Sequence, residues 1–219
     1  MRTRVKICGI TRVADALAAC NAGADAIGLN FWSGTPRFVE VGRAREIADA
    51  LPPFVTKVAL FVDPEPAHVR AILDALPIDT LQFHGTEVPD LCRSFGRPYL
   101  KAVHMKDGVD LLEYAALYED AAGLVFDSYW PSDLPGGTGR VFDWSRLTKD
   151  VRAKLPAPVI LGGGLNPQNV EAAIRQVRPW AVDVSSGVEE VGPDGKARRG
   201  LKDASRIEAF MNGVRHADD

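Results

Sequence analysis

The sequence predicts an α/β fold, a single-domain (β/α)8 TIM barrel over residues 1–219, and three observations predict it. Short apolar runs alternate with longer amphipathic stretches along the whole chain, which is the pattern of repeated βα units around a parallel sheet. We count eight such units, the number that closes a barrel. No linker or low-complexity segment interrupts them, and this favours a closed barrel over an open doubly wound sheet.

Each unit begins with an apolar run of strand length and continues into a stretch with helical periodicity. The expected strands are residues 4–8, 26–31, 57–62, 80–84, 99–103, 123–127, 159–162 and 181–185. The expected helices are residues 14–21, 43–50, 66–76, 88–95, 108–118, 144–154, 167–176 and 204–211.

The composition is that of an ordinary globular protein and excludes several classes. With a formal net charge of −3 and no clustered basic excess, the chain has no nucleic-acid footprint. No apolar stretch approaches the roughly 18 residues that span a bilayer. Three cysteines, an odd number without a C-x-x-C pair, predict reduced thiols. We therefore expect a cytoplasmic protein with no nucleic-acid or membrane partner. Barrels of this kind occur as monomers and as dimers, so the expected assembly is a monomer or a homodimer.

Polar residues recur near the carboxyl ends of the expected strands, where period-two alternation puts them on one face. If that face is the barrel interior, the polar groups collect at the C-terminal mouth, where barrel enzymes do their chemistry. The residues concerned are Cys8, Asn30, Gln82, His84, Asp127, Asp183 and Ser185. Taken alone, Cys8 is more simply a small apolar core residue, and His84 an inward polar residue hydrogen-bonded at the rim.

Two glycine-rich turns follow the seventh and eighth strands. Glycine lets backbone N–H groups approach an anion closely, and the N-terminus of a following helix adds positive potential. The loops after these two strands are also the usual phosphate site of this fold. We therefore expect a phosphorylated small-molecule substrate, bound by Gly163, Gly164, Ser185, Ser186 and Gly187.

A third glycine cluster, residues 135–139, lies in the long segment after the sixth strand. Its composition suits either a lid that closes over a substrate or a solvated loop.

These motifs together resemble the phosphoribosylanthranilate isomerase family of tryptophan biosynthesis, over nearly the whole chain. Each motif is weakly specific alone, but their order and spacing are specific. They are VKICGIT at 5–11, GADAIG at 23–28, PRFV at 36–39, QFHG at 82–85, GGTG at 136–139, LGGGL at 161–165 and DVSSGVE at 183–189.

The resemblance implies the third step from chorismate: the Amadori rearrangement of N-(5-phosphoribosyl)anthranilate to 1-(o-carboxyphenylamino)-1-deoxyribulose 5-phosphate. The family does this aldose–ketose isomerisation without metal or organic cofactor, so we expect none. By resemblance Cys8 is the general base and Asp127 the general acid. The thiol must then ionise more easily than a free thiol, near 8.5, and Asp127 must hold its proton longer than a free aspartate, near 3.9. Lys6 or Arg37 is a candidate for favouring the thiolate, and a dry mouth for raising the pKa of the acid.

Arg37 matches the family arginine that binds the anthranilate carboxylate, for which a guanidinium fork is well suited. Asp183 matches a family position at the end of the eighth strand, where we expect substrate contact or positioning of the acid and base. One departure from the family is the length of residues 190–201. The Pro-Asp-Gly turn signal within it predicts a protruding surface loop, which puts the local shape beside the phosphate site in question.

Two other functions account for parts of the same pattern. Another phosphosugar barrel enzyme loses ground, because histidine-pathway isomerases carry an aspartate where Cys8 stands and ribulose-phosphate epimerases carry metal-binding histidines that are absent here. A non-catalytic barrel that binds a phosphorylated metabolite would need the phosphate turns and Arg37, but would not need both Cys8 and Asp127.

Overall fold

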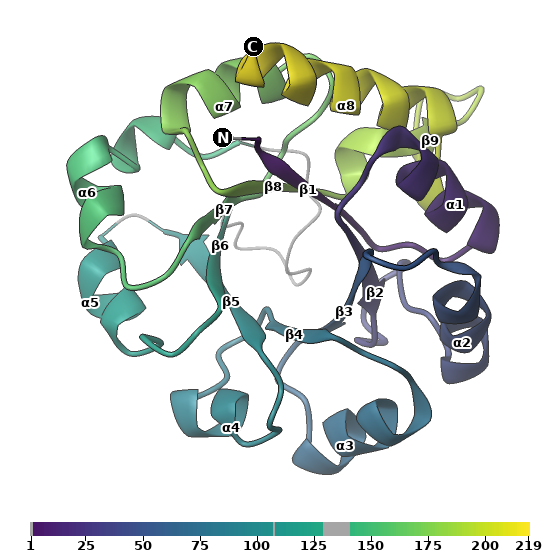
Figure 1. The fold of residues 1–219 in the computed structure, drawn as a ribbon, viewed down its shortest axis with the longest axis horizontal. Helices are drawn as coiled ribbons and strands as arrows, with labels where there is room; N and C mark the ends of the chain where they lie inside the picture. Colours follow the sequence, from purple (N-terminus) through teal and green to yellow (C-terminus); the bar gives the residue numbers. More distant parts are fainter. Residues whose placement is uncertain (1, 107, 129–140) are drawn as a thin grey trace.

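A computed structural model describes residues 2–106, 108–128 and 141–219 and shows the predicted closed barrel (Figure 1). Eight parallel strands follow one another around it in chain order, and β1 pairs with β8 to close it. The strands are β1 (Arg4–Cys8), β2 (Ala26–Asn30), β3 (Thr56–Phe61), β4 (Thr80–Phe83), β5 (Tyr99–Met105), β6 (Gly123–Ser128), β7 (Val159–Leu161) and β8 (Ala181–Val184). No predicted strand end differs from these by more than two residues.

The helices form an outer ring around the strands (Figure 1). They are α1 (Val13–Ala22), α2 (Val41–Ala50), α3 (Pro66–Ala75), α4 (Pro89–Arg93), α5 (Leu111–Ala116), α6 (Lys149–Lys154), α7 (Val170–Val177) and α8 (Ala204–Asp218), with short 3-10 turns η1 (Trp144–Arg146) and η2 (Ser186–Val188). Among the helices that the structure describes, none has the length and apolar character needed to cross a membrane.

The helix predicted over residues 144–154 is divided in two. The hydroxyl of Thr148 accepts a hydrogen bond from the N–H of Val151 at 3.2 Å, and α6 starts at the next residue, Lys149. A side chain that accepts a hydrogen bond from a first-turn N–H marks the start of a helix. The chain therefore leaves the 3-10 turn η1 after Arg146 and starts a separate helix, α6.

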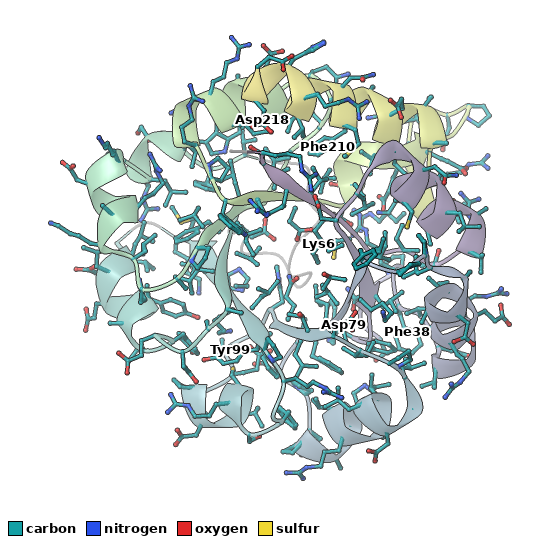
Figure 2. The ribbon with its side chains drawn as sticks, viewed as in Figure 1. Lys6, Phe38, Asp79, Tyr99, Phe210 and Asp218 are labelled. Carbon is teal, nitrogen blue, oxygen red and sulfur yellow. The ribbon has the colours of Figure 1, made fainter. Side chains whose placement is uncertain are left out.

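Residues on the two faces of each strand separate into two cores. A small cluster fills the bottom of the barrel interior, formed by Val58, Leu100, Val125, Ile160 and Ala181. A much larger cluster lies between the strands and the helices and includes Phe210 of α8. Figure 2 shows Lys6 inside the ring of strands and Phe210 between α8 and the barrel wall. Above this apolar cluster, polar side chains such as Gln82, Asp127 and Asp183 occupy the upper part of the interior.

A buried ion pair fixes the β4–α4 loop beside the mouth. The ammonium of Lys101 lies 2.7 Å from a carboxylate oxygen of Glu87, and both side chains are fully buried. Lys101 also donates to the carbonyl oxygen of Gly85 at 2.7 Å, and Glu87 accepts the N–H of Gly85 at 3.0 Å. Buried charges need such partners, so the loop that follows His84 is held on both sides.

Candidate active site

A cavity opens at the carboxyl ends of the strands and collects eight of the nine predicted site residues. They are Cys8, Arg37, Asp127, Gly163, Gly164, Asp183, Ser185 and Ser186, accompanied by Asn30, Gln82 and His84. Gly187 does not line this cavity but an adjacent groove, which Ser186 also lines. The third glycine cluster, residues 135–139, for which the sequence left a lid and a solvated loop open, lies outside the described residues.

Cys8 is the last residue of β1, and its side chain points into the mouth. A Cβ at the facing position, Gly28 of β2, would stand 2.8 Å from the Cys8 sulfur, so the glycine leaves the space that the thiol occupies. Two positions below on the same face, the Lys6 ammonium pairs with Asp183 at 2.8 Å. Lys6, Cys8 and Asp183 therefore form a buried group in which the one ammonium interacts with both the carboxylate and the thiol.

The pKa of Cys8 lies above its ordinary value, so the expectation that this thiol ionises more easily than a free thiol was wrong. Burial is the largest cause, because it penalises the thiolate, and the charge of Asp183 adds to it. Lys6 works in the opposite direction through its charge and a hydrogen bond to the sulfur, and Lys202 contributes more weakly. Lys6 is thus the cationic neighbour that the sequence suggested, but it offsets only part of the burial cost.

Asp127, near the end of β6, accepts hydrogen bonds at both carboxylate oxygens. Its Oδ1 accepts the N–H of Ser128 at 2.7 Å, and its Oδ2 lies 3.1 Å from Nε2 of His84. A Cβ at Gly163 would come within 2.7 Å of Oδ1, and Gly163 has a φ of +73°. A glycine at this point in the turn after β7 therefore has two effects: it allows the positive φ of the turn, and it leaves room for the carboxylate of Asp127.

The pKa of Asp127 is lowered, which is the reverse of the expectation that a dry mouth would raise it. Burial does push the pKa up, but the hydrogen bond and charge of His84, the charge of His104 and the Ser128 N–H outweigh it. The expectation was wrong because the sequence places His84 on the same rim without showing that it contacts the carboxylate.

The two glycine turns present backbone donors to the cavity. Gly163 and Gly164 both have positive φ, and their N–H groups have no hydrogen-bond acceptor within the described part of the chain. The second turn differs from the expectation of a following helix, because η2 is a 3-10 turn of three residues and α8 begins only at Ala204. An anion at this turn would therefore be bound by individual backbone N–H groups and not by the dipole of a helix.

The segment predicted as a surface loop is a two-stranded hairpin, β9 (Glu189–Val191) and β10 (Ala197–Lys202). Its Gly192–Gly195 tip is a turn, closed by the N–H of Gly192 on the carbonyl of Lys196 at 2.8 Å, as the Pro-Asp-Gly signal indicated. Its base, however, is buried: Glu189 and Lys202 are 1% and 3% exposed. Sequence patterns show a turn, but they do not show that the strands flanking it reach the site.

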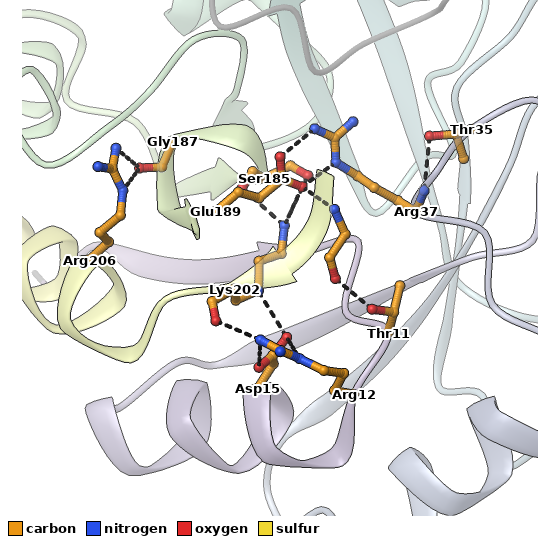
Figure 3. Close-up of polar contacts among 11 residues, drawn as sticks. Thr11, Arg12, Asp15, Thr35, Arg37, Ser185, Gly187, Glu189, Lys202 and Arg206 are labelled. Atoms are coloured by element: carbon orange, nitrogen blue, oxygen red, sulfur yellow. Dashed lines mark hydrogen bonds and ion pairs between the residues drawn. The ribbon is translucent and has the colours of Figure 1, made fainter. Parts of the chain in front are cut away.

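Glu189 at the base of the hairpin holds Arg37. The carboxylate accepts from Nε and Nη2 of Arg37 at 2.7 and 2.9 Å, and it also accepts the N–H of Gly200 at 2.8 Å (Figure 3). Burial would raise the pKa of Glu189, but Arg37 and Lys202 hold it below its ordinary value. Arg37, predicted to bind a substrate carboxylate, already binds a protein carboxylate along one edge of its guanidinium.

Lys202 adds a second cation to the same carboxylate. Its Nζ lies 3.3 Å from Glu189 and 3.0 Å from the carbonyl oxygen of Ser185. Burial and the charge of Arg37 lower the pKa of Lys202 to about 8, and Glu189 offsets this only in part. Two cations therefore share one carboxylate, and the cluster leaves net positive charge beside the phosphate turn. Sequence reasoning missed both Glu189 and Lys202.

The three cysteines are free thiols, as expected. Among the residues for which the structure gives positions, no three histidine, cysteine or acidic side chains are placed to hold a metal ion together.

The chain matches, over residues 5–213, the family model described as N-(5'-phosphoribosyl)anthranilate (PRA) isomerase. The chain belongs to this family. Relatives in it include the N-(5'-phosphoribosyl)anthranilate isomerase of Alcanivorax borkumensis, 57% identical over 97% of this chain and 95% of the relative, and that of Nitrosococcus oceani, 51% identical over 98% of each.

Solved structures of the family have the same fold. The phosphoribosyl anthranilate isomerase of Thermotoga maritima is 36% identical, with a TM-score of 0.85 over 98% of this chain and 99% of that one. Another structure of a phosphoribosyl anthranilate isomerase, 36% identical with a TM-score of 0.82, is a complex with reduced 1-(o-carboxyphenylamino)-1-deoxyribulose 5-phosphate, and it covers 98% of this chain and 99% of that one. Family membership confirms the predicted barrel and the predicted activity together.

Breaking the Glu189 cluster is expected to cost stability. Glu189→Gln leaves the buried charges of Arg37 and Lys202 without their carboxylate, and should lower the free energy of unfolding by about 3 kcal/mol. Urea denaturation at neutral pH measures it. The adjacent Glu190→Gln removes a half-buried ion pair with Arg12 and should cost less than about 1 kcal/mol. Equal losses in the two variants would contradict the assigned role of Glu189.

Proposed function

We propose that this chain carries out its family's isomerisation with Cys8 as general base and Asp127 as general acid. The activity, conversion of N-(5'-phosphoribosyl)anthranilate to the aminoketose phosphate, is that of the family. The observation that carries the assignment of roles is the cavity itself, which Cys8 from β1 and Asp127 from β6 line together. These strands are not neighbours, so an acid and a base face one sugar from different sides.

In the first step, Asp127 donates its proton to the ring oxygen of the ribose as the bond between that oxygen and C1 breaks. The nitrogen lone pair forms the C1–N double bond, which leaves an iminium ion and the Asp127 carboxylate. The hydrogen bonds from Ser128 and His84 stabilise this carboxylate, so they favour the product side of the transfer.

In the second step, the Cys8 thiolate takes the proton from C2, and the C–H electrons form the enolamine while the iminium nitrogen becomes neutral. A proton then moves from the enol oxygen to C1 and gives the ketone. Turnover ends when the proton on Cys8 returns through solvent to Asp127. Lys6 supports the thiolate, since its charge lowers the pKa of Cys8.

The phosphate is proposed to bind at Gly163, Gly164, Ser185, Ser186 and Gly187. Two features support this placement: the N–H groups of Gly163 and Gly164, which have no acceptor in the described ranges, and the positive charge of the Arg37 and Lys202 cluster. Gly187 would contribute from the adjacent groove, since it does not line the cavity itself.

Arg37 is proposed to bind the anthranilate carboxylate with the edge of its guanidinium that Glu189 leaves unused. Glu189 accepts hydrogen bonds from Nε and Nη2 of Arg37. Because a guanidinium carries five N–H donors, Nη1 and the second N–H of Nη2 can donate to another carboxylate. Asp183 is proposed as a positioning residue, because its contact in the structure is to Lys6, which in turn serves Cys8.

The test is a fluorescence assay that follows consumption of freshly made phosphoribosylanthranilate. The wild-type protein should consume it, and Arg37→Lys, which loses the planar fork, should raise KM roughly tenfold or more with a smaller change in kcat. A wild type without activity would overturn the proposal. A chelator should leave the rate unchanged; inhibition by EDTA that added metal reverses would contradict the expectation of no cofactor.

The assembly and location of this chain stay predictions. A Thermotoga maritima structure, 35% identical over 98% of this chain and 99% of that one with a TM-score of 0.82, is described as mutually generated monomers of a dimeric enzyme. For this chain we propose a monomer or homodimer in the cytoplasm, without nucleic-acid partners, and size-exclusion chromatography with light scattering distinguishes the two assemblies.

A further inference from the structure

A buried chain of hydrogen bonds runs behind the acid, from β4 to β6. The side-chain amide of Gln82 contacts Nδ1 of His84 at 3.1 Å, and Nε2 of His84 contacts Oδ2 of Asp127 at 3.1 Å. Gln82 is 0% and His84 6% exposed. The mechanism so far uses His84 only to stabilise the carboxylate, and it gives Gln82 no part.

The arrangement favours the wrong form of Asp127 for a proton donor. Both oxygens of its carboxylate accept hydrogen bonds, so nothing in the contacts of Asp127 itself keeps a proton there. The reaction nevertheless needs a proton at this carboxyl group at the start of every turnover. The proton must therefore be held by a group that contacts Asp127, and His84 is that group.

The amide of Gln82 decides where the proton on His84 sits. Its Nε2 donates to Nδ1 of His84, while its Oε1 is buried without a hydrogen-bond partner among the described residues. In this orientation Nδ1 carries no proton, and Nε2–H donates to the Asp127 carboxylate. Turning the amide by half a turn points Oε1 at Nδ1, which must then carry a proton. One amide atom lacks a partner in either orientation, so these contacts do not lock the amide.

We propose that Gln82 and His84 are positioning residues that supply Asp127 with the proton it donates, the Gln82 amide turning as Nδ1 of His84 takes up a proton. This rests on the proposed role of Asp127. With Nδ1–H bound to Oε1, the ring can pass its Nε2 proton to Oδ2 and remain neutral. Asp127 then gives that proton to the ring oxygen, and the proton that returns through solvent at the end of turnover restores the pair.

The other groups that face His84 suit this role. The His104 ring from β5 lies edge-on with centroids 5.3 Å apart, and its Nε2 contacts the His84 carbonyl oxygen at 2.8 Å. Burial, with the charge of His84, lowers the pKa of His104 to about 4, so it stays neutral when the enzyme works. Lys101 of β5 and Glu87 of the β4–α4 loop pair with each other. Among the described residues, Asp127 is thus the charged group in contact with the ring.

The experiment compares two substitutions with opposite effects on Nδ1–H. Gln82→Met keeps the length of the side chain but removes the acceptor, and should lower the single-turnover rate at neutral pH about tenfold and shift the alkaline fall of that rate roughly one pH unit lower. Gln82→Glu supplies a stronger acceptor and should move the fall to higher pH. A packing role would lower the rate in both variants without moving the pH profile in opposite directions.

Two controls keep the outcome decisive. If Asp127→Asn is inactive and both Gln82 variants keep the wild-type pH profile, the inference is overturned while the proposed function stands. If Asp127→Asn is fully active, the acid assignment itself fails. Should Gln82→Met not fold, nitrogen-15 NMR of the wild-type histidines, assigned with His84→Asn, decides. A proton on Nδ1 of His84 in the active pH range supports the inference, and a bare Nδ1 throughout it overturns it.

Discussion

Asp127→Asn is expected to lower kcat about 10²- to 10⁴-fold, because the amide has no acidic proton to give to the ribose ring oxygen. The substitution nearly preserves shape, and its carbonyl oxygen can still accept the hydrogen bond from Ser128 that Oδ1 accepts now. Binding of the reduced product analogue should therefore stay close to wild type. A large loss in kcat with intact binding is the signature of an interaction that matters in the transition state.

The matched control is Asp90→Asn, the same change on an exposed carboxylate of α4. It should leave both kcat and binding unchanged. Steady-state kinetics and calorimetric titration with the reduced product analogue give the two quantities for each variant. Full activity in Asp127→Asn would remove the carboxyl group from the mechanism and leave the acid to be sought among the other groups of the mouth.

The contacts of Asp127 show which features of the site the sequence could predict and which it could not. Period-two alternation correctly predicted that Cys8, Gln82, His84, Asp127 and Asp183 share the barrel mouth, because strand periodicity is a local property. It did not predict that His84 contacts Asp127 and lowers its pKa, since that depends on the register of β4 and β6 through the strand between them. Positions on a rim are readable from the chain, but pairwise contacts are not.

Arg37 and Glu189 show the same limit over a longer range. They are 152 residues apart, and their bidentate pair forms only because the hairpin β9–β10 folds back over the loop after β2. Turn chemistry predicted the tip of that hairpin. Its buried base could not be predicted, because Glu189 and Lys202 are charged residues whose burial depends on each other and on Arg37.

Cys8→Ser is expected to lower kcat/KM about 10²- to 10⁴-fold, because the hydroxyl fits the space against Gly28 but does not ionise in the working pH range. The thiolate is the form that takes the C2 proton, and burial holds the pKa of Cys8 above its ordinary value. In the free enzyme the thiol is therefore mostly protonated at neutral pH. It follows that kcat/KM of the wild type should rise with pH, about tenfold per unit, and should fall again at alkaline pH once the His84–Asp127 pair has lost the proton to be donated.

Lys6 fixes where that rise lies. Lys6→Met removes the cation that lowers the pKa of Cys8 and leaves the Asp183 carboxylate unpaired beside the sulfur, and both changes disfavour the thiolate. The rise should therefore move to higher pH, while the rate at high pH recovers toward the wild-type value. Thiolate absorbance in the ultraviolet, taken as the difference between each protein and its Cys8→Ser counterpart, titrates the same group directly. If the rise lies at the same pH in Lys6→Met as in the wild type, it does not report the Cys8 thiolate, and the base is not Cys8. No other thiol lines this cavity within the described residues.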